Sequence, residues 1–176
     1  MKLLVVVDMQ NDFIDGVLGT PEAVAIVPAV AAKIKQYREN GDAIIYTADT
    51  HYEGVYAHTM EGQKLPVLHC VQGTHGWDIA DGLYVPGAPV VTKMTFGSDE
   101  LPRRIIALIN YLGEELEAIE FVGLCTDICV ISNVMITKAF LADTPIIVDS
   151  SCCAGVTPTS HENALNAMKM CHIDVI

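Results

Sequence analysis

Two cysteines, Cys125 and Cys129, lie four residues apart in the segment EFVGLCTDICV, directly after a short apolar run. Cysteines in such a place can be metal ligands, half of a disulfide, core fillers or nucleophiles. Cys129 comes two residues after Asp127, in the first turn of an expected helix, where free N–H groups and the helix dipole favour a thiolate. Taken alone, Cys129 is more typical of a small buried residue, so its role depends on the side chains that lie near it.

Reactive side chains also end other apolar runs: Asp8 ends LLVVVD, and Lys93 ends APVVTK. Because ligands bind outside the carboxyl ends of the strands in an open parallel sheet, we expect Asp8, Lys93 and Cys129 to meet. This trio indicates acyl transfer, in which Asp8 takes the thiol proton and returns it to a leaving amine. Lys93 would stabilise the thiolate, and Cys129 would form a thioester that water cleaves. Backbone N–H groups of Cys125 and Cys129 could bind the developing oxyanion.

A second group of side chains is typical of a metal site. Asp49 and His51 form a D-x-H pair at the end of the run DAIIYTAD, and on an extended chain both point to one side. We choose His69 as the third ligand, with His58 and His75 as rivals. One carboxylate and two imidazoles, with positions open for water or substrate, suit Zn²⁺ and also Fe²⁺ or Mn²⁺.

Short, continuous, β-branched runs recur along the chain and alternate with helical patterns, which predicts strands buried on both faces. We therefore expect an α/β fold of three layers, α/β/α, with a doubly wound, mostly parallel sheet of six strands. The runs are LLVVVD, DAIIYTAD, APVVTK, AIEFVG, TPIIVD and HIDVI. Helices are expected over residues 21–40, 98–112, 127–141 and 157–170, the second capped by Ser98. Residues 50–89 show little periodicity, and a loop of that length is usually functional.

The composition limits the class of protein. A chain of 176 residues favours one domain, here residues 1–176, and 51% hydrophobic residues can build a full core. A formal net charge of -12 argues against nucleic-acid binding. No apolar segment is long enough for a membrane span or a signal peptide, so we expect a cytoplasmic protein whose six cysteines are reduced. A mean hydropathy of +0.37 favours a homo-oligomer that buries some apolar surface.

These segments together resemble the isochorismatase-like cysteine hydrolases over almost the whole chain. VVDMQNDF is similar to the opening motif of that family, VTKMTFGSD to its lysine segment, and VGLCTDICV to its cysteine motif. The resemblance implies that Asp8, Lys93 and Cys129 are the catalytic residues. It also implies a non-proline cis peptide between Leu124 and Cys125, at the turn that would hold the oxyanion.

Within that family, ADTH followed by LPVLHCVQGTHG is similar to the metal motif of the nicotinamidases. The resemblance implies that Asp49, His51 and His69 bind the metal and that the metal takes the ring nitrogen of nicotinamide. An aromatic residue, often Trp, usually precedes the proline of this motif, whereas this chain has Leu65. Phe13 would then stack on the pyridine ring, with Leu65 as an apolar wall.

The resemblance implies a metal-dependent amidohydrolase that converts nicotinamide to nicotinate and ammonia, in pyridine nucleotide salvage. One alternative is the same chemistry on a different small amide. Another is a non-catalytic module that binds a metal or a ligand, since a fold does not fix a function. A nucleotide-binding module is disfavoured because DMQNDF has no glycines to hold a phosphate. Isochorismatase activity is disfavoured too, because cleaving a vinyl ether needs neither Cys129 nor the metal ligands.

Overall fold

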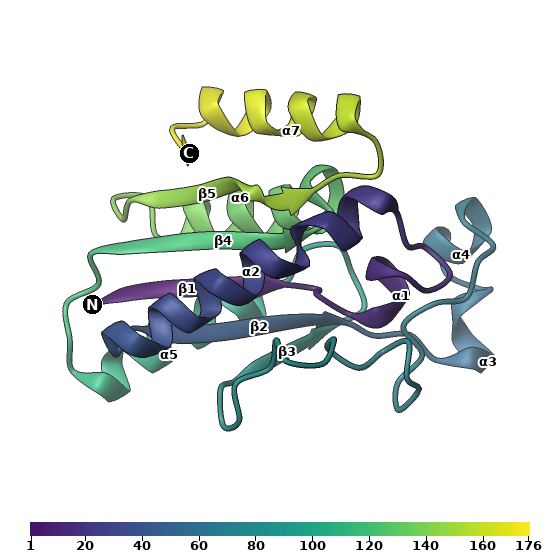
Figure 1. The fold of residues 1–176 in the computed structure, drawn as a ribbon, viewed down its shortest axis with the longest axis horizontal. Helices are drawn as coiled ribbons and strands as arrows, with labels where there is room; N and C mark the ends of the chain where they lie inside the picture. The colour runs from purple at the N-terminus through teal and green to yellow at the C-terminus, as the bar shows by residue number, and fades with distance from the viewer.

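The computed structural model describes residues 1–176 and contains one sheet of six strands, all parallel. The strand order is β3-β2-β1-β4-β5-β6, so the chain builds the sheet outward from β1 in both directions (Figure 1). The strands are β1 (Lys2–Val7), β2 (Ala43–Asp49), β3 (Val90–Lys93), β4 (Ala118–Leu124), β5 (Ile146–Ala154) and β6 (Asp174–Val175). The order reverses between β1 and β4, and ligands bind at such a switch point.

Helices cover both faces of the sheet, which confirms the predicted three-layer α/β/α fold (Figure 1). The helix α2 (Pro21–Asn40) packs on one face, and α5 (Glu100–Leu112), α6 (Ile131–Phe140) and α7 (Pro158–Met170) pack on the other. Successive β1 side chains face opposite layers: Val5 joins the core under α5, α6 and α7, and Val6 joins the core under α2. Both faces of the sheet are therefore shielded from water, which explains why the strand sequences are continuous apolar runs.

Local sequence signals place the ends of two helices where they were predicted. Thr20 caps α2 by accepting a hydrogen bond from the N–H of Ala23 at 3.0 Å, and Gly41 ends the helix in the left-handed region, at φ 75°. Thr157 and Ser160 form a reciprocal capping box at the start of α7. These caps satisfy N–H and C=O groups that have no partner inside the helix.

Three predicted boundaries were wrong. The helix expected from Ser98 begins at Glu100, because Ser98 instead accepts the N–H of Glu100 across a turn, at 3.2 Å. The helix expected over 127–141 is divided into a π-helical turn, η1 (Thr126–Val130), and α6. The strand expected to end at Asp149 continues to Ala154, since β5 shifts register against β4 and then resumes pairing.

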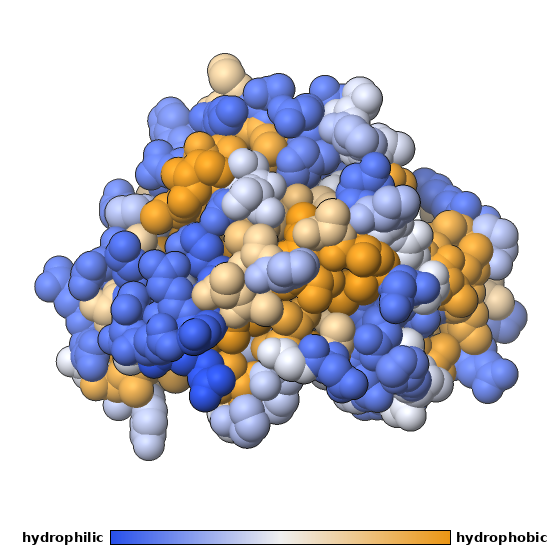
Figure 2. All heavy atoms as spheres, in the orientation of Figure 1, coloured by the Kyte–Doolittle hydropathy of each residue, from blue (hydrophilic) through white to orange (hydrophobic).

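The aperiodic stretch between β2 and β3 contains two single-turn helices, α3 (Glu53–Tyr56) and α4 (Met60–Lys64), and a third, α1 (Asn11–Ile14), follows β1. All three lie at the carboxyl end of the sheet (Figure 1). The space-filling view shows apolar surface at that end of the molecule, bordered by polar residues (Figure 2). None of the helices combines the length and the apolar character that a membrane crossing needs.

Candidate active site

The three side chains predicted to do the chemistry lie together at the carboxyl edge of the sheet. Asp8 follows β1, Lys93 ends β3, and Cys129 lies in η1 after β4. The Nζ of Lys93 is 2.6 Å from Oδ2 of Asp8 and 3.6 Å from Sγ of Cys129. All three residues are buried, Asp8 completely. The ammonium of Lys93 thus contacts both the carboxylate of Asp8 and the thiol of Cys129 in a site of low dielectric.

Asp8 adopts an uncommon backbone conformation directly after β1. Its φ is 47°, in the left-handed region that Asp tolerates better than most residues. The hydroxyl of Thr47 on β2 donates a hydrogen bond of 2.6 Å to Oδ1. Since Lys93 faces the other carboxylate oxygen, both oxygens of Asp8 have a partner and the side chain is fixed.

The strand that leads to Cys129 comes unusually close to β1. Gly123 of β4 has a φ of 121°, and a Cβ added there would lie 2.1 Å from the carbonyl oxygen of Val7. Only glycine is compatible with this approach. The peptide bond between Leu124 and Cys125 that follows is cis, as the family resemblance implied.

Burial dominates the electrostatics of the trio. It raises the pKa of Asp8 above its usual value, against the attraction of Lys93. It lowers the pKa of Lys93, but Asp8, Cys129 and Asp49 outweigh this effect and hold that pKa above its usual value. The ammonium is therefore charged at neutral pH, and its attraction opposes the effect of burial on Asp8.

The expectation of an acidified thiol was wrong. Burial, and next the charge of Asp8, raise the pKa of Cys129 well above its usual value, and Lys93 reduces this effect only in part. A cysteine in the first turn of a helix favours the thiolate when it stays hydrated, whereas Cys129 is buried in the core under α5, α6 and α7. The thiol thus keeps its proton and needs an adjacent base.

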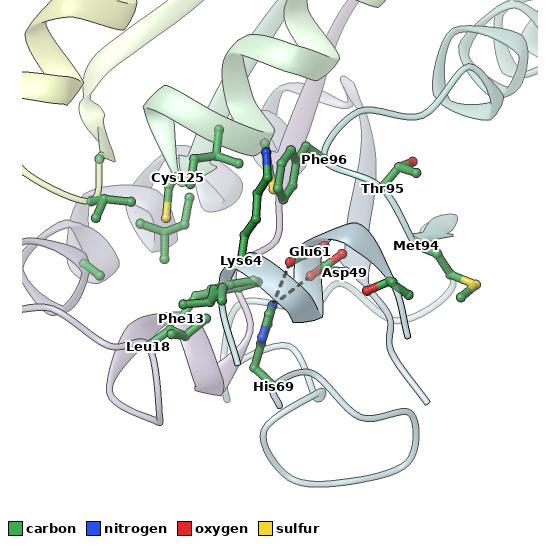
Figure 3. Close-up of a pocket in the computed structure, with 18 of the residues that line it drawn as sticks. Phe13, Leu18, Asp49, Glu61, Lys64, His69, Met94, Thr95, Phe96 and Cys125 are labelled. Carbon is green, nitrogen blue, oxygen red and sulfur yellow. Dashed lines mark ion pairs between the residues drawn. The ribbon is translucent and has the colours of Figure 1, made fainter. Parts of the chain in front are cut away.

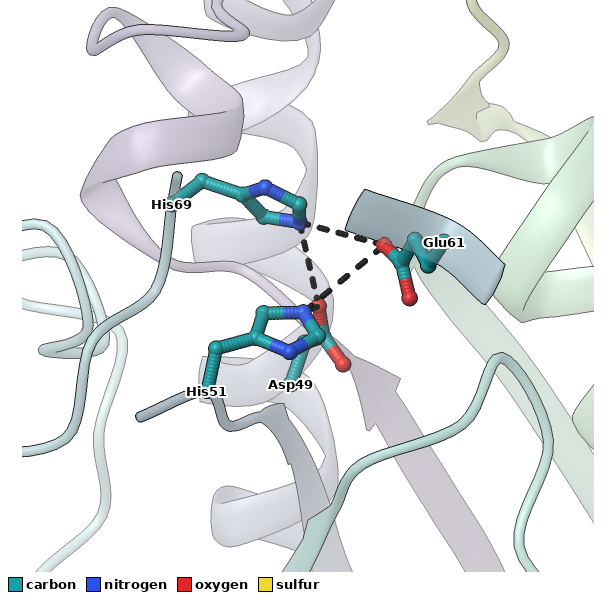
Figure 4. A group of neighbouring side chains, drawn as sticks. All are labelled: Asp49, His51, Glu61 and His69. Atoms are coloured by element: carbon teal, nitrogen blue, oxygen red, sulfur yellow. Dashed lines mark hydrogen bonds and ion pairs between the residues drawn. The ribbon is translucent and has the colours of Figure 1, made fainter. Parts of the chain in front are cut away.

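Asp49, His51 and His69 converge beside the trio and are joined by Glu61 of α4 (Figure 4). One potential ligand atom from each of the four lies within 4.8 Å of the others. Asp49 Oδ2 is 2.9 Å from Nε2 of His51 and 3.4 Å from Nε2 of His69. Oε1 of Glu61 is 3.7 Å and 3.5 Å from the same two nitrogens. The rival ligands His58 and His75 are exposed and are not part of this group.

Glu61 was missed because it lies in an aperiodic stretch with no motif around it. The only local signal was the Thr59 cap, which accepts the N–H of Gly62 at 3.0 Å and starts the turn that carries Glu61. That signal predicts a helix start and nothing about a ligand. The fold of the loop, rather than the local sequence, directs the side chain of Glu61 toward His51 and His69.

The N-terminal motif also supports the metal-ligand group, in a way the sequence did not reveal. The buried side chain of Gln10 accepts the N–H of Asp49 at 2.7 Å and donates to the carbonyl of Asp49 at 2.9 Å. The carboxylate of Asp12 accepts the N–H of Cys70 at 2.7 Å, next to His69. One short segment after β1 therefore carries Asp8 and holds the backbone of two potential ligands.

The four side chains fit a divalent cation. Two imidazoles and two carboxylates form the mixed nitrogen and oxygen donor set of Zn²⁺, Fe²⁺ or Mn²⁺. Nδ1 of His69 lies 2.8 Å from the carbonyl of Val67, which leaves Nε2 free to bind a metal. Burial lowers the pKa of His69, but Asp49 and Glu61 raise it to about 10, so the site favours positive charge. Oδ1 of Asp49 is buried, accepts no hydrogen bond and faces Lys93 Nζ at 3.5 Å.

Members of both groups line one cavity of about 680 Å³ (Figure 3). Cys129 lines it together with Asp49, Glu61 and His69. The predicted substrate contacts Phe13 and Leu65 are among the lining residues, and so are Leu124 and Cys125 at the predicted oxyanion turn. Trp77 does not line the cavity, since its indole N–H donates to the hydroxyl of Thr50 at 2.9 Å. The aromatic ring of Phe96 contributes to the wall as well, and no sequence motif had indicated this residue.

Comparison with known proteins agrees with this geometry. The isochorismatase domain family matches residues 2–176. An uncharacterised isochorismatase family protein of Bacillus subtilis, PncA, is 27% identical over 94% of this chain and 92% of its own. Two crystal structures superpose with a TM-score of 0.82 at 25% identity: pyrazinamidase of Pyrococcus horikoshii in complex with zinc, and pyrazinamidase/nicotinamidase of Streptococcus mutans. They cover 99% and 100% of this chain, and 98% and 100% of their own. The chain therefore belongs to the isochorismatase domain family.

Proposed function

We propose that this protein is a metal-dependent cysteine amidohydrolase that converts nicotinamide to nicotinate and ammonia. The observation that carries the proposal is the position of Lys93, 2.6 Å from Asp8 and 3.5 Å from Asp49. Its buried ammonium joins the reactive trio to the potential metal ligands, and Cys129 and three of those ligands line one cavity. The names of the similar pyrazinamidase and nicotinamidase structures support the same reaction class. Nicotinate would then feed pyridine nucleotide salvage.

The proposed reaction starts with a proton transfer. Asp8 takes the proton of the Cys129 thiol, and Sγ attacks the amide carbon. The raised pKa of Asp8 suits this role, because a carboxylate that is too weak a base could not accept the proton. Lys93 compensates the charge of the thiolate at 3.6 Å. Asp8 then returns the proton to the nitrogen, the C–N bond breaks, and ammonia leaves behind a thioester.

The second half of the reaction uses the same residues. Asp8, now a carboxylate again, takes a proton from water, which attacks the thioester carbon. The C–S bond breaks, Cys129 recovers its proton, and the free acid leaves. The turn at Leu124 and Cys125 would provide backbone N–H groups to the oxyanion in both halves. Every step needs the substrate held still between Cys129 and the opposite wall of the cavity.

Asp49, His51, Glu61 and His69 would hold the metal, most simply Zn²⁺. When bound, the metal supplies a coordination position for the ring nitrogen of a pyridine amide. Phe13 and Leu65 would form the walls beside the ring. The ring of Phe13 lies edge-on to His69, with centroids 5.4 Å apart, so ring position and metal position are linked through one contact.

A second candidate is the same chemistry on a different small amide, since a cavity of about 680 Å³ is not restricted to nicotinamide. The expectations of a single domain over residues 1–176, of a cytoplasmic enzyme and of a homo-oligomer stay predictions.

The test is release of ammonia from nicotinamide by zinc-loaded protein. Cys129→Ala and His69→Ala are expected to lose turnover, by at least about a hundredfold. Cys171→Ala and His58→Ala are the matched controls, because both residues are exposed and lie outside the cavity. Full activity in Cys129→Ala would refute the mechanism. An unchanged zinc requirement and turnover in His69→Ala would refute the metal site.

A further inference from the structure

The cavity is much larger than nicotinamide. At about 680 Å³ it lies within the range of about 300–1,000 Å³ that holds drug-sized ligands, whereas nicotinamide is one six-membered ring with a carboxamide. A substrate of that size would occupy a minor part of the space and leave the remainder to water. We propose that the preferred substrates are aromatic amides that carry an extended apolar substituent, an alkyl chain or a second ring. This inference rests on the proposed amidase function.

The charged side chains that line the cavity are three potential metal ligands, Asp49, Glu61 and His69, and Lys64. The other hydroxyls in the wall are already used. Thr59 donates to the carbonyl of Tyr56 and Thr95 to that of Gly97, both at 2.7 Å, and Thr20 accepts the N–H of Ala23. Each of these hydroxyls is thus already engaged by the protein, which reduces what it offers to a polar ligand group. The part of a ligand that extends beyond the amide and the ring therefore binds more favourably when it is apolar.

The rest of the wall is aliphatic, thioether and aromatic, and it is exposed at the mouth. Met60 is 68% exposed and Val156 51%, and Leu65, Met94 and Phe96 are also exposed. Met60 is in α4, at the end of the molecule where Figures 1 and 2 show apolar surface. Methionine side chains adapt to different ligand shapes. Ligand carbon placed against these side chains would leave water together with them, which is favourable.

Lys64 is the only lysine or arginine that lines the cavity, and it does not contradict an apolar substituent. It is exposed and forms no ion pair, and its side chain extends toward Phe96 in Figure 3. A lysine in such a position adds its aliphatic stem to the wall and keeps its ammonium in water. It closes one side of the mouth without demanding a negative charge from the ligand.

The experiment compares kcat/KM for nicotinamide with its 5-methyl, 5-propyl, 5-butyl and 5-phenyl derivatives on zinc-loaded protein. The 5-position is meta to both the ring nitrogen and the carboxamide, so neither reacting end is blocked. We expect kcat/KM to rise about fourfold for each methylene that is buried. The 5-butyl amide should then exceed nicotinamide by more than about tenfold even when half of the chain stays in water.

Two pairs of variants locate the effect. Leu65→Trp fills the cavity and Met60→Gln makes its mouth polar, so both should lower the ratio of kcat/KM for the 5-butyl amide to that for nicotinamide. Leu68→Trp and Met170→Gln are the matched controls, since Leu68 is as exposed as Leu65 and Met170 is exposed like Met60, and neither lines the cavity. Both controls should keep the parent ratio. A ratio that falls equally in variants and controls would overturn the inference.

The outcomes separate this inference from the proposed function. Turnover of nicotinamide with kcat/KM flat or falling along the series would overturn the inference and leave the amidase intact. If no amide is hydrolysed, the amidase proposal fails, and calorimetric Kd values of the same amides on Cys129→Ala protein decide the inference. A Kd that tightens with the length of the substituent would support it, and a Kd independent of length would overturn it.

Discussion

Lys93→Met removes the one cation buried among the reactive groups, and its effect on stability can be worked out from the structure. Lys93 is 4% exposed, and its Nζ lies 2.6 Å from Asp8, 3.5 Å from Asp49 and 3.6 Å from Cys129. Methionine keeps most of the side-chain volume without the charge. The variant therefore leaves Asp8, which is completely buried, as an uncompensated carboxylate.

The expected loss is large for a single substitution. At 2.6 Å and an effective dielectric constant of about 20, the attraction between Lys93 and Asp8 is about 6 kcal/mol. The cost of removing the ammonium from water opposes this attraction, so the free energy of unfolding should fall by about 3–5 kcal/mol at neutral pH. Lys64, an exposed lysine that lines the cavity, gives a matched control: Lys64→Met should change the free energy of unfolding by less than about 0.5 kcal/mol.

The loss of stability in Lys93→Met should depend on pH, and the direction of this dependence follows from the pKa of Asp8. Burial already raises the pKa of Asp8 in the folded protein, and removing Lys93 raises it further. A carboxyl whose pKa is higher in the folded than in the unfolded protein lowers the free energy of unfolding when it ionises. This cost is absent below the unfolded pKa of about 3.9 and increases as pH rises through the folded pKa. The difference between variant and parent should therefore be greatest at neutral pH and shrink as pH falls toward about 4.

Urea unfolding of both proteins at pH 7.5 and pH 5, with a chelator present, measures this difference. The double variant Asp8→Asn/Lys93→Met should recover part of the loss at pH 7.5, because it removes the unpaired charge as well. A Lys93→Met protein as stable as the parent at pH 7.5 would refute the view that Lys93 compensates Asp8. A loss that is the same at both pH values would also refute it.

Three further predictions concern the metal ligands and the sheet. Glu61→Gln should weaken zinc binding by at least about tenfold, measured by competition with a fluorescent chelator, because it removes an anionic ligand. Zinc affinity should fall as pH is lowered from 8 to 6, by about tenfold per unit for each proton released, since the proton that the carboxylates hold on His69 must leave. Gly123→Ala should lower the free energy of unfolding by at least about 3 kcal/mol in urea, or prevent folding, because a Cβ would meet the carbonyl of Val7 at 2.1 Å.

Matched variants make these predictions decisive. Glu53→Gln changes an exposed carboxylate outside the metal-ligand group and should keep the parent affinity for zinc, so equal losses in both variants would exclude a special role of Glu61. Gly82→Ala is also at a positive φ, 80°, but nothing lies within 4 Å of its added Cβ, so only about 1 kcal/mol should be lost. Equal stability of Gly82→Ala and Gly123→Ala would contradict the close approach of β4 to β1. A zinc affinity independent of pH would contradict proton release.

The positions of the reactive residues along the chain already indicated where they would meet. Asp8, Asp49 and Lys93 each end an apolar run, and parallel strands place their carboxyl ends at one edge. The continuous β-branched runs predicted the buried parallel sheet for the same reason, since helices cover both faces. Cys129 could be assigned to the same edge because it closely follows β4.

Other features required contacts between distant segments. Glu61 reaches the two histidines only through the fold of an aperiodic loop, and Gln10 holds Asp49 through hydrogen bonds across 39 positions of sequence. The continuation of β5 to Ala154 depends on how it pairs with β4, so the sequence of β5 alone could not place its end. Each of these features depends on a partner that local propensity does not include.

The sequence by itself determined the number and order of the strands, the span of α2, the cap of α7 and the residue types available at the edge of the sheet, because these follow from local periodicity and local hydrogen bonding. Only the tertiary structure decided the protonation of the site. The position of Cys129 in a helical turn predicted a thiolate, but the turn is packed into the core, and desolvation outweighs the dipole. Tertiary packing also set the size of the cavity, because its walls come from segments that are far apart in the chain. The burial of a side chain depends on all the helices and strands that pack around it, so it cannot be read from one segment of the sequence.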